Sequence, residues 1–174
     1  KAHGGGLPAL CRCARLSGMQ RQPLRHRLLR QWESPPTWLV LFLALALVQA
    51  RHLPLVDAGW PGRIAGGVLG LSGLAIFCLA LREFRRHRTT VLPRETPVAM
   101  IDSGIYRLSR NPIYLADALF LAGAALWWDA ASLLLVPLFV MIITRRFILG
   151  EEAVLRAVFG AAFDRYAAQT RRWL

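Results

Sequence analysis

Residues 64–81 read IAGGVLGLSGLAIFCLAL, a run of apolar and small residues without a single charged side chain. This run approaches the roughly 20 apolar residues that an α-helix needs to cross a bilayer. Gly62, Gly66 and Gly70 recur every four residues, so they place a small-residue groove on one helix face. We expect another helix to pack closely against this face, as is common at small-residue contacts between membrane helices.

Other apolar runs extend this pattern over the rest of the chain. Trp127-Trp128-Asp129 resembles a turn at the membrane interface and divides the longest run in two. Between the second and third runs, residues 89–109 contain Pro93, Pro97 and Gly104 and are typical of an irregular connection. The runs predict spans at about 37–56, 64–81, 112–128 and 130–147 within a bundle of residues 37–174.

The two ends of the chain differ from the apolar runs. Residues 1–36 predict a basic cytoplasmic tail with one short surface helix near residues 24–32. Residues 150–170 predict an amphipathic cytoplasmic helix, which Gly160 can break into two pieces. The fold class that follows is an all-α integral membrane bundle of about four transmembrane helices with a C-terminal amphipathic helix.

Composition and charge support a membrane protein rather than a nucleic-acid-binding one. Apolar residue types make up 55% of the 174 residues and charged types only 18%. The net charge of +12 would first suggest nucleic acid in a soluble protein. Here the long uncharged runs instead favour a bilayer with anionic headgroups as the partner. If the protein is bacterial, we expect it in the inner or plasma membrane. Cys11, Cys13 and His3 are only a weak metal signature, and we expect no metal site.

The distribution of charge predicts which segments share a compartment. Segment 1–36 has one lysine and six arginines against one acid, segment 82–113 has seven arginines against three acids, and segment 145–174 has six against three. Since basic segments stay cytoplasmic, four spans with both termini in the cytoplasm satisfy the positive-inside rule. The segments 82–113 and 145–174 then face the same compartment, so they can meet.

The first polar cluster is Arg110-Asn111-Pro112-Ile113-Tyr114, just before the third span. Asn111 suits the N-cap of a helix, and Pro112 suits the first helical position, where its missing N–H costs nothing. The simplest interpretation is a capped interfacial helix. Asp117, one turn further on, is interpreted as an interfacial acid near the helix start, although an intramembrane acid is also a functional hypothesis.

The second polar cluster combines Arg146 with the neighbouring carboxylates Glu151 and Glu152. Two adjacent carboxylates at a membrane boundary repel each other and need cations nearby. The simplest interpretation is a helix start, where acids favour the positive end of the helix dipole.

Together the two clusters resemble the isoprenylcysteine carboxyl methyltransferase-like family of membrane methyltransferases, which includes phospholipid methyltransferases. The resemblance covers about residues 64–174. The matching pieces are Thr89-Thr90-Val91-x-Pro93, Gly104-x-Tyr106, Arg110-Asn111-Pro112-x-Tyr114, Glu151-Glu152-x-x-Leu155, Phe159-Gly160, Tyr166 and Arg171-Arg172-Trp173.

This resemblance implies a methyltransferase that uses S-adenosylmethionine (SAM) and takes a lipid or lipophilic substrate from the bilayer. It implies that the cofactor lies on the cytoplasmic face between segments 102–114 and 145–174. The implied catalytic residues are Arg146, Glu151 and Glu152. The implied cofactor-binding residues are Tyr106, Arg110, Asn111, Pro112, Tyr114, Glu151 and Glu152. The prenylcysteine enzymes usually have His where this sequence has Asn111.

The chemistry of these residue types agrees with such a cofactor. An arginine fork at Arg110 or Arg146 suits the carboxylate of SAM, and Glu151 or Glu152 can accept hydrogen bonds from a ribose diol or an ammonium group. Two alternatives remain open: an NADPH-dependent reductase of the sterol-reductase type, and a non-catalytic scaffold that binds anionic lipid. The sequence selects neither the acceptor, which can be a carboxylate, an amine or a thiol, nor the oligomeric state.

Overall fold

The computed structural model of the chain describes residues 34–87 and 100–174. The second of two units, residues 35–174, contains all the elements described below. The surface helix predicted near residues 24–32 lies outside the described residues.

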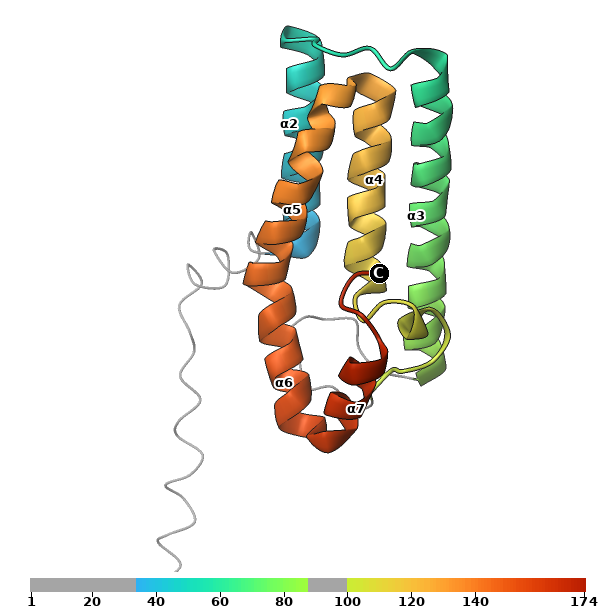
Figure 1. Cartoon of the computed structure of the whole chain (residues 1–174), viewed down its shortest axis with the longest axis vertical. Coiled ribbons are helices and arrows are strands. Elements are labelled where there is room, and N and C mark those ends of the chain that lie inside the picture. Colours follow the sequence, from blue (N-terminus) through green and yellow to red (C-terminus); the bar gives the residue numbers. More distant parts are fainter. Residues whose placement is uncertain (1–33, 88–99) are drawn as a thin grey trace, which may run out of the picture. The chain divides into compact units, whose positions relative to one another are not determined.

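Four helices lie side by side in the second unit (Figure 1). They are α2 (Pro35–His52), α3 (Gly59–His87), α4 (Pro112–Trp128) and α5 (Leu135–Ile143). A short 3₁₀ helix, η2 (Gly104–Arg107), precedes α4, and a second one, η3 (Ala130–Leu134), precedes α5. Within the described residues every element is helical, so the predicted all-α class is confirmed.

Beyond α5 the chain continues through a π-helical turn, η4 (Thr144–Ile148), directly into α6 (Leu149–Phe159). It then reverses at Gly160 into α7 (Ala161–Gln169), as the sequence predicted for a helix broken at this glycine. In Figure 1, α6 and α7 lie at the same end of the bundle as η2 and the start of α4. Segments 100–111 and 145–174 therefore occupy one end of the bundle.

Helix α4 coincides with the predicted range 112–128, whereas the other helices differ from theirs. α2 begins at Pro35 and ends at His52, before the predicted end at about residue 56. α3 extends past both ends of its predicted range, to Gly59 and His87. The predicted helix 130–147 is interrupted, because Asp129 caps η3 by accepting the amide of Ala131 and Pro137 has no N–H for an α-helical bond.

Two helical stretches of the described part are long and apolar enough to cross a membrane, Gly59–His87 and Ala130–Phe159. The apolar helix α4 is shorter. These features support a helical membrane protein, and the number of four spans stays a prediction.

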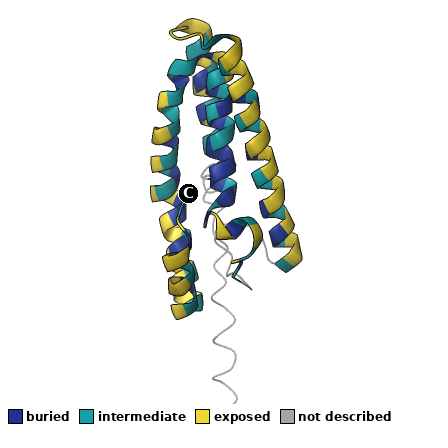
Figure 2. Cartoon of the chain, turned by 45° about the vertical axis from the view of Figure 1, so that its right-hand side comes forward, coloured by how far each residue is buried: buried dark blue, intermediate teal, exposed yellow. Residues whose placement is uncertain are grey.

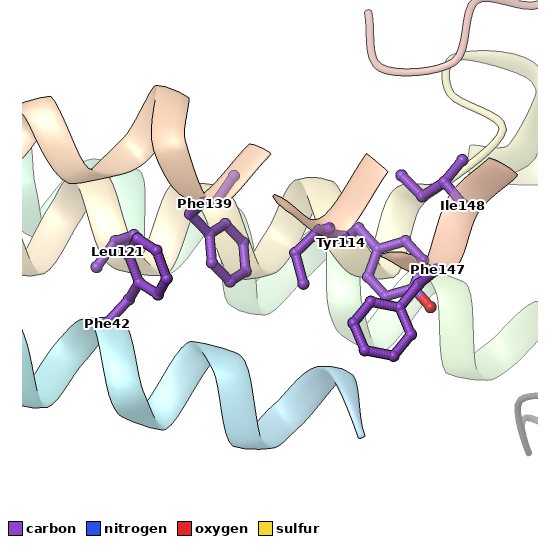
Figure 3. Packing of buried hydrophobic residues seen from close by; sticks show 8 residues of the cluster. Phe42, Tyr114, Leu121, Phe139, Phe147 and Ile148 are labelled. Carbon is purple, nitrogen blue, oxygen red and sulfur yellow. The ribbon is translucent and has the colours of Figure 1, made fainter. Parts of the chain in front are cut away.

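Helix α4 forms the centre of this unit. It carries more buried residues than any other described helix, whereas α2 and α3 bury few of theirs, as the dark blue and yellow colouring of the ribbon in Figure 2 shows. The main apolar cluster joins α4 to α2, α5 and η4. Figure 3 labels six of its members, Phe42, Tyr114, Leu121, Phe139, Phe147 and Ile148.

The glycine groove of α3 packs against α4, as predicted. A Cβ atom on Gly66 would lie 2.6 Å from the carbonyl oxygen of Gly123, and a Cβ on Gly123 would lie 2.6 Å from the carbonyl oxygen of Gly66. Real Cβ atoms do not approach this closely, so the contact between the two helices requires glycine on both sides. Gly70, one turn along the groove, has open space where a Cβ would stand.

Asp129 fixes the opposite end of the bundle from η2. Its carboxylate accepts the backbone N–H groups of Leu55 (2.6 Å), Val56 (3.1 Å) and Ala131 (2.9 Å). Burial alone would raise the pKa of Asp129, but these donors outweigh it and hold the pKa below its usual value. The connection between α2 and α3 is therefore fastened to the turn after α4.

We predict that Gly66→Ala lowers the free energy of unfolding by about 1–3 kcal/mol, because the added methyl group forces α3 and α4 apart. Gly70→Ala is the matched control and should be neutral or stabilising by about 0.5–1 kcal/mol, since alanine is the better helix former. Thermal unfolding in one detergent compares the two. Equal destabilisation by both substitutions would contradict the close contact at Gly66.

Candidate functional site

A cavity of about 370 Å³ lies at the end of the bundle where η2, α6 and α7 meet the start of α4. This volume falls within the range of small-molecule pockets, about 300–1,000 Å³. Seven of the eight predicted site residues line it: Tyr106, Arg110, Asn111, Pro112, Tyr114, Glu151 and Glu152. The rest of its wall comes mostly from apolar side chains of α3, α4, α6 and α7, with Asp117 and Tyr166 among the polar ones.

Arg146 does not line this cavity. Its side chain is exposed, and its guanidinium lies over the ring of Trp38, 5.6 Å from the ring centroid. This distance is typical of a cation–π contact. The structure therefore brings together every predicted site residue except Arg146, while their roles remain predictions.

The end of α3 holds one wall of the cavity through Glu83, a buried carboxylate. Ser103 Oγ donates a hydrogen bond to Glu83 Oε2 (2.7 Å), and the same hydroxyl lies 2.9 Å from His87 Nε2. Gly104 has a φ of +57°, and a Cβ at this position would lie 2.6 Å from Glu83 Oε1. Glycine adopts this φ without strain and leaves room for the Glu83 carboxylate, whereas another residue would strain the backbone and displace that carboxylate. This contact fixes η2, so Tyr106 faces the cavity.

The C-terminal segment crosses the start of α4. The backbone N–H of Arg110 donates to the carbonyl of Arg171 (3.0 Å), and the side chains of Ser109 and Asn111 donate to the carbonyl of Arg172 (3.2 and 3.0 Å). Asn111 occupies the predicted N-cap, and Pro112 the first helical position. However, the Asn111 side chain makes no capping bond, because its amide group fastens the C-terminal segment instead.

The two neighbouring glutamates have different partners. Glu152 is buried and receives two hydrogen bonds from the Arg172 guanidinium, Nε to Oε1 at 2.9 Å and Nη2 to Oε2 at 2.7 Å. Arg110 Nη2 lies 3.5 Å from the same carboxylate. Glu151 instead accepts a hydrogen bond from the hydroxyl of Tyr114 (2.8 Å). Of the cations that the sequence led us to expect near these acids, Arg172 and Arg110 both compensate Glu152.

The fork between Arg172 and Glu152 is a bidentate, charge-assisted pair, the strongest kind of side-chain hydrogen bonding. The hydrogen bond to Glu152 raises the pKa of the Arg172 guanidinium. Trp173 adds a further contact between the C-terminal segment and the bundle, since its indole N–H donates to Thr144 Oγ1 (3.2 Å) in η4. The last residues of the chain thus join α6, η4 and the start of α4.

Two tyrosines stay neutral in this site. Burial raises the pKa of Tyr106, and the nearby Tyr166 and Glu151 add to the shift. Burial also raises the pKa of Tyr166, although Arg110 opposes it. Tyr166 donates its hydroxyl hydrogen to the carbonyl of Tyr106 (2.7 Å), which fastens α7 to η2.

One polar atom at the cavity has no partner among the described residues. This atom is Nε of Arg110, whose N–H is buried without a hydrogen bond. Buried donors are nearly always satisfied in folded proteins, so an exception calls for an explanation, such as a bound water, an ion or a functional role. Within the Arg110 guanidinium, Nη2 therefore lies near Glu152, while the Nε–H has no hydrogen-bond acceptor among the described residues.

Three charged residues that matter here were not among the predicted site residues: the buried acids Glu83 and Asp117, and the half-buried Arg172. Glu83 gave no signal, because it lies in a run of basic residues that resembles a solvated helix end. Arg172 belongs to the closing Arg171-Arg172-Trp173 motif, but spacing alone does not reveal its partner. For Asp117 the sequence allowed an interfacial acid or a functional one, and the structure shows it buried in the cavity wall.

The comparison with protein families agrees with this arrangement. The sequence model of the phospholipid methyltransferase family matches residues 62–162, more than half of the chain. The chain therefore belongs to the phospholipid methyltransferase family, and the resemblance stated from the motifs is confirmed. Searches of curated proteins and of solved structures gave no match.

The matched residues run from α3 into α7 and include every predicted site residue. The family supports membrane methyltransferase activity for this chain.

We predict that Arg172→Gln loosens the C-terminal closure. The change removes the guanidinium fork from buried Glu152, and we expect a loss of about 1–2 kcal/mol, since the pair is partly exposed. Hydrogen exchange of the backbone amides of residues 161–174 should become faster. Arg171→Gln, whose side chain is exposed, is the matched control. Unchanged exchange in Arg172→Gln would contradict the closing role of the pair.

Proposed function

We propose that this protein transfers a methyl group from SAM to an acceptor on a membrane lipid, with the cofactor bound in the cavity between η2 and α6. The observation that carries this proposal is the meeting of Arg110, Glu151 and Tyr114 in one cavity, within a chain of the phospholipid methyltransferase family. Two neighbouring acids and an under-satisfied arginine match a ligand that carries both signs of charge.

The donor set fits the polar groups of SAM. Arg110 supplies a buried N–H without a partner among the described residues, which suits the cofactor carboxylate. Glu151, held by the Tyr114 hydroxyl, suits the ammonium group or the ribose diol. Glu152 is engaged by Arg172, so we assign it the task of orienting Arg110. We assign Arg146 no cofactor contact, because it lies over Trp38.

Tyr106, Asn111 and Pro112 form the wall between these polar groups and the bundle. The neutral ring of Tyr106 forms a T-shaped pair with the ring of Phe84, with the ring centroids 5.9 Å apart. Pro112 is fully buried at the start of α4, and the Asn111 amide fastens the C-terminal segment above it. This wall gives the adenosine part of the cofactor a rigid apolar surface, as cofactor pockets usually do.

The acceptor reaches the site from the apolar side of the cavity. Phe77 and Leu81 on α3 and Ile113 on α4 line this side. Aliphatic and aromatic side chains at a membrane helix suit the acyl part of a lipid. We further propose four spans with both termini in the cytoplasm, which places the polar end of the cavity in the cytoplasmic leaflet.

The residues contribute to methyl transfer mainly by position. When bound, SAM supplies an electrophilic methyl carbon on a sulfonium. Arg110 and Glu151 fix the two charged ends of the reactant, which gives the in-line alignment that such a displacement requires. The apolar wall and the closed C-terminal segment exclude water. A dry site favours the step, because the charges of the reactants become less localised as the bond forms.

We predict that wild-type protein in detergent binds SAM saturably in calorimetry. Glu151→Gln and Arg110→Ala should each weaken binding at least about tenfold, which corresponds to about 1.4 kcal/mol. Arg107→Ala removes an exposed arginine from the same segment and is the matched control for Arg110→Ala. Binding of NADPH in place of SAM would favour a reductase, and binding of neither would favour a lipid-binding scaffold. Both results contradict the proposal.

A further inference from the structure

Asp117 is a buried carboxylate in the wall of the cavity. It lies on α4, is 8% exposed, and lines the same cavity as Tyr114 and Glu151. It follows Tyr114 by three residues, so both side chains share one helix face. Because an α-helix rises about 1.5 Å per residue, Asp117 lies about 7.5 Å deeper along α4 than Pro112. It therefore stands on the bundle side of the cavity.

Asp117 differs from the other acids of the site in its partners. Each of the other acids accepts a hydrogen bond: Glu83 from Ser103, Glu151 from Tyr114, and Glu152 from Arg172. Within residues 34–87 and 100–174, Asp117 has no hydrogen bond and no ion pair. A buried carboxylate without a cation or a donor is costly, and such groups inside membrane proteins usually mark a substrate or proton path.

We propose that Asp117 is a catalytic residue that binds the ammonium group of the lipid acceptor and takes its proton. This inference rests on the proposed function and adds an acid–base step to it. The position supports it, because Asp117 lies deeper along α4 than Arg110 and lines the same cavity as Phe77 and Ile113, beside which we propose that the acceptor enters. Among the described acids that line the cavity, Asp117 is the one without a protein partner. An ammonium group on this path would therefore bind Asp117.

A primary amine acceptor binds in its protonated, ammonium form. The carboxylate of Asp117 accepts one proton from the ammonium, which leaves a neutral amine with a free electron pair. The nitrogen forms a bond to the methyl carbon while the carbon–sulfur bond breaks and its electron pair stays on sulfur. The product is a methylated ammonium, the sulfonium becomes a neutral thioether, and Asp117 then releases its proton to water.

The same carboxylate disfavours the other acceptors. A thiolate or carboxylate acceptor has no proton to give, and it would place a second negative charge beside buried Asp117. Like charges in such a position cost several kcal/mol in complexes between charged partners. Asp117 therefore selects nitrogen over anionic sulfur or oxygen.

The test measures methyl transfer from labelled SAM to vesicles that contain a lipid with an ethanolamine headgroup. Asp117→Asn keeps the size and polarity of the side chain but removes the proton acceptor. We expect kcat to fall about 100-fold or more, in the range for loss of a general base. The rate of the variant should rise about tenfold per pH unit, because the free amine becomes commoner, and the wild type should rise less steeply.

Two further measurements separate this role from a structural one. The Asp117→Asn protein should bind SAM as tightly as the wild type and unfold at the same or a higher temperature, since it loses an uncompensated buried charge. Without cofactor, the wild type should bind dodecyltrimethylammonium about tenfold more tightly than the variant does. Asp164→Asn, which removes an exposed acid paired with Arg156 on α6, is the control for charge alone.

The outcomes distinguish the two proposals. Asp117→Asn activity within threefold of the wild type, an unchanged pH slope, or equal binding of the ammonium amphiphile would overturn the role of Asp117. Loss of SAM binding in Asp117→Asn would also overturn it, because the residue would then belong to the cofactor site. Absence of SAM binding in the wild type would instead overturn the proposed function itself.

Discussion

The pairing of Arg172 with Glu152 is the interaction on which the site depends. The guanidinium of Arg172 satisfies a buried carboxylate on α6, and its carbonyl accepts hydrogen bonds from Ser109 and Asn111 at the start of α4. One residue near the chain end therefore joins two segments that are far apart in sequence. Ordering such a connection costs chain entropy, and the charge-assisted pair together with these bonds offsets that cost.

Helix α4 supplies the common wall of core and cavity. Its middle packs against Phe42 and Phe139, its glycine contact with Gly66 brings α3 close, and its first turns present Tyr114 and Asp117 to the cavity. The acids around the cavity then divide by partner. Glu152 is compensated by arginine and Glu151 accepts from tyrosine, whereas Asp117 has no such partner among the described residues. This division separates the proposed cofactor end from the proposed acceptor end.

Periodicity and small-residue spacing predicted most of the fold. The range of α4, the break at Gly160 and the packing of Gly66 all follow from local patterns, so they were accessible from sequence. The pairing of Arg172 with Glu152, the anchor at Glu83 and the use of Asn111 as a tether depend on tertiary contacts that no spacing encodes. Arg146 was predicted as a site residue from its place in a motif, and its contact with Trp38 could not be foreseen because the two residues are far apart in sequence.

Ultraviolet crosslinking of labelled SAM, followed by mass spectrometry of the labelled peptides, tests the central claim most directly. If both segments close over one cofactor, label should fall within residues 100–117 and within residues 149–166, and excess unlabelled SAM should abolish it. Label confined to residues 47–63 at the opposite end of the bundle, or label that excess SAM does not compete, would contradict a shared site.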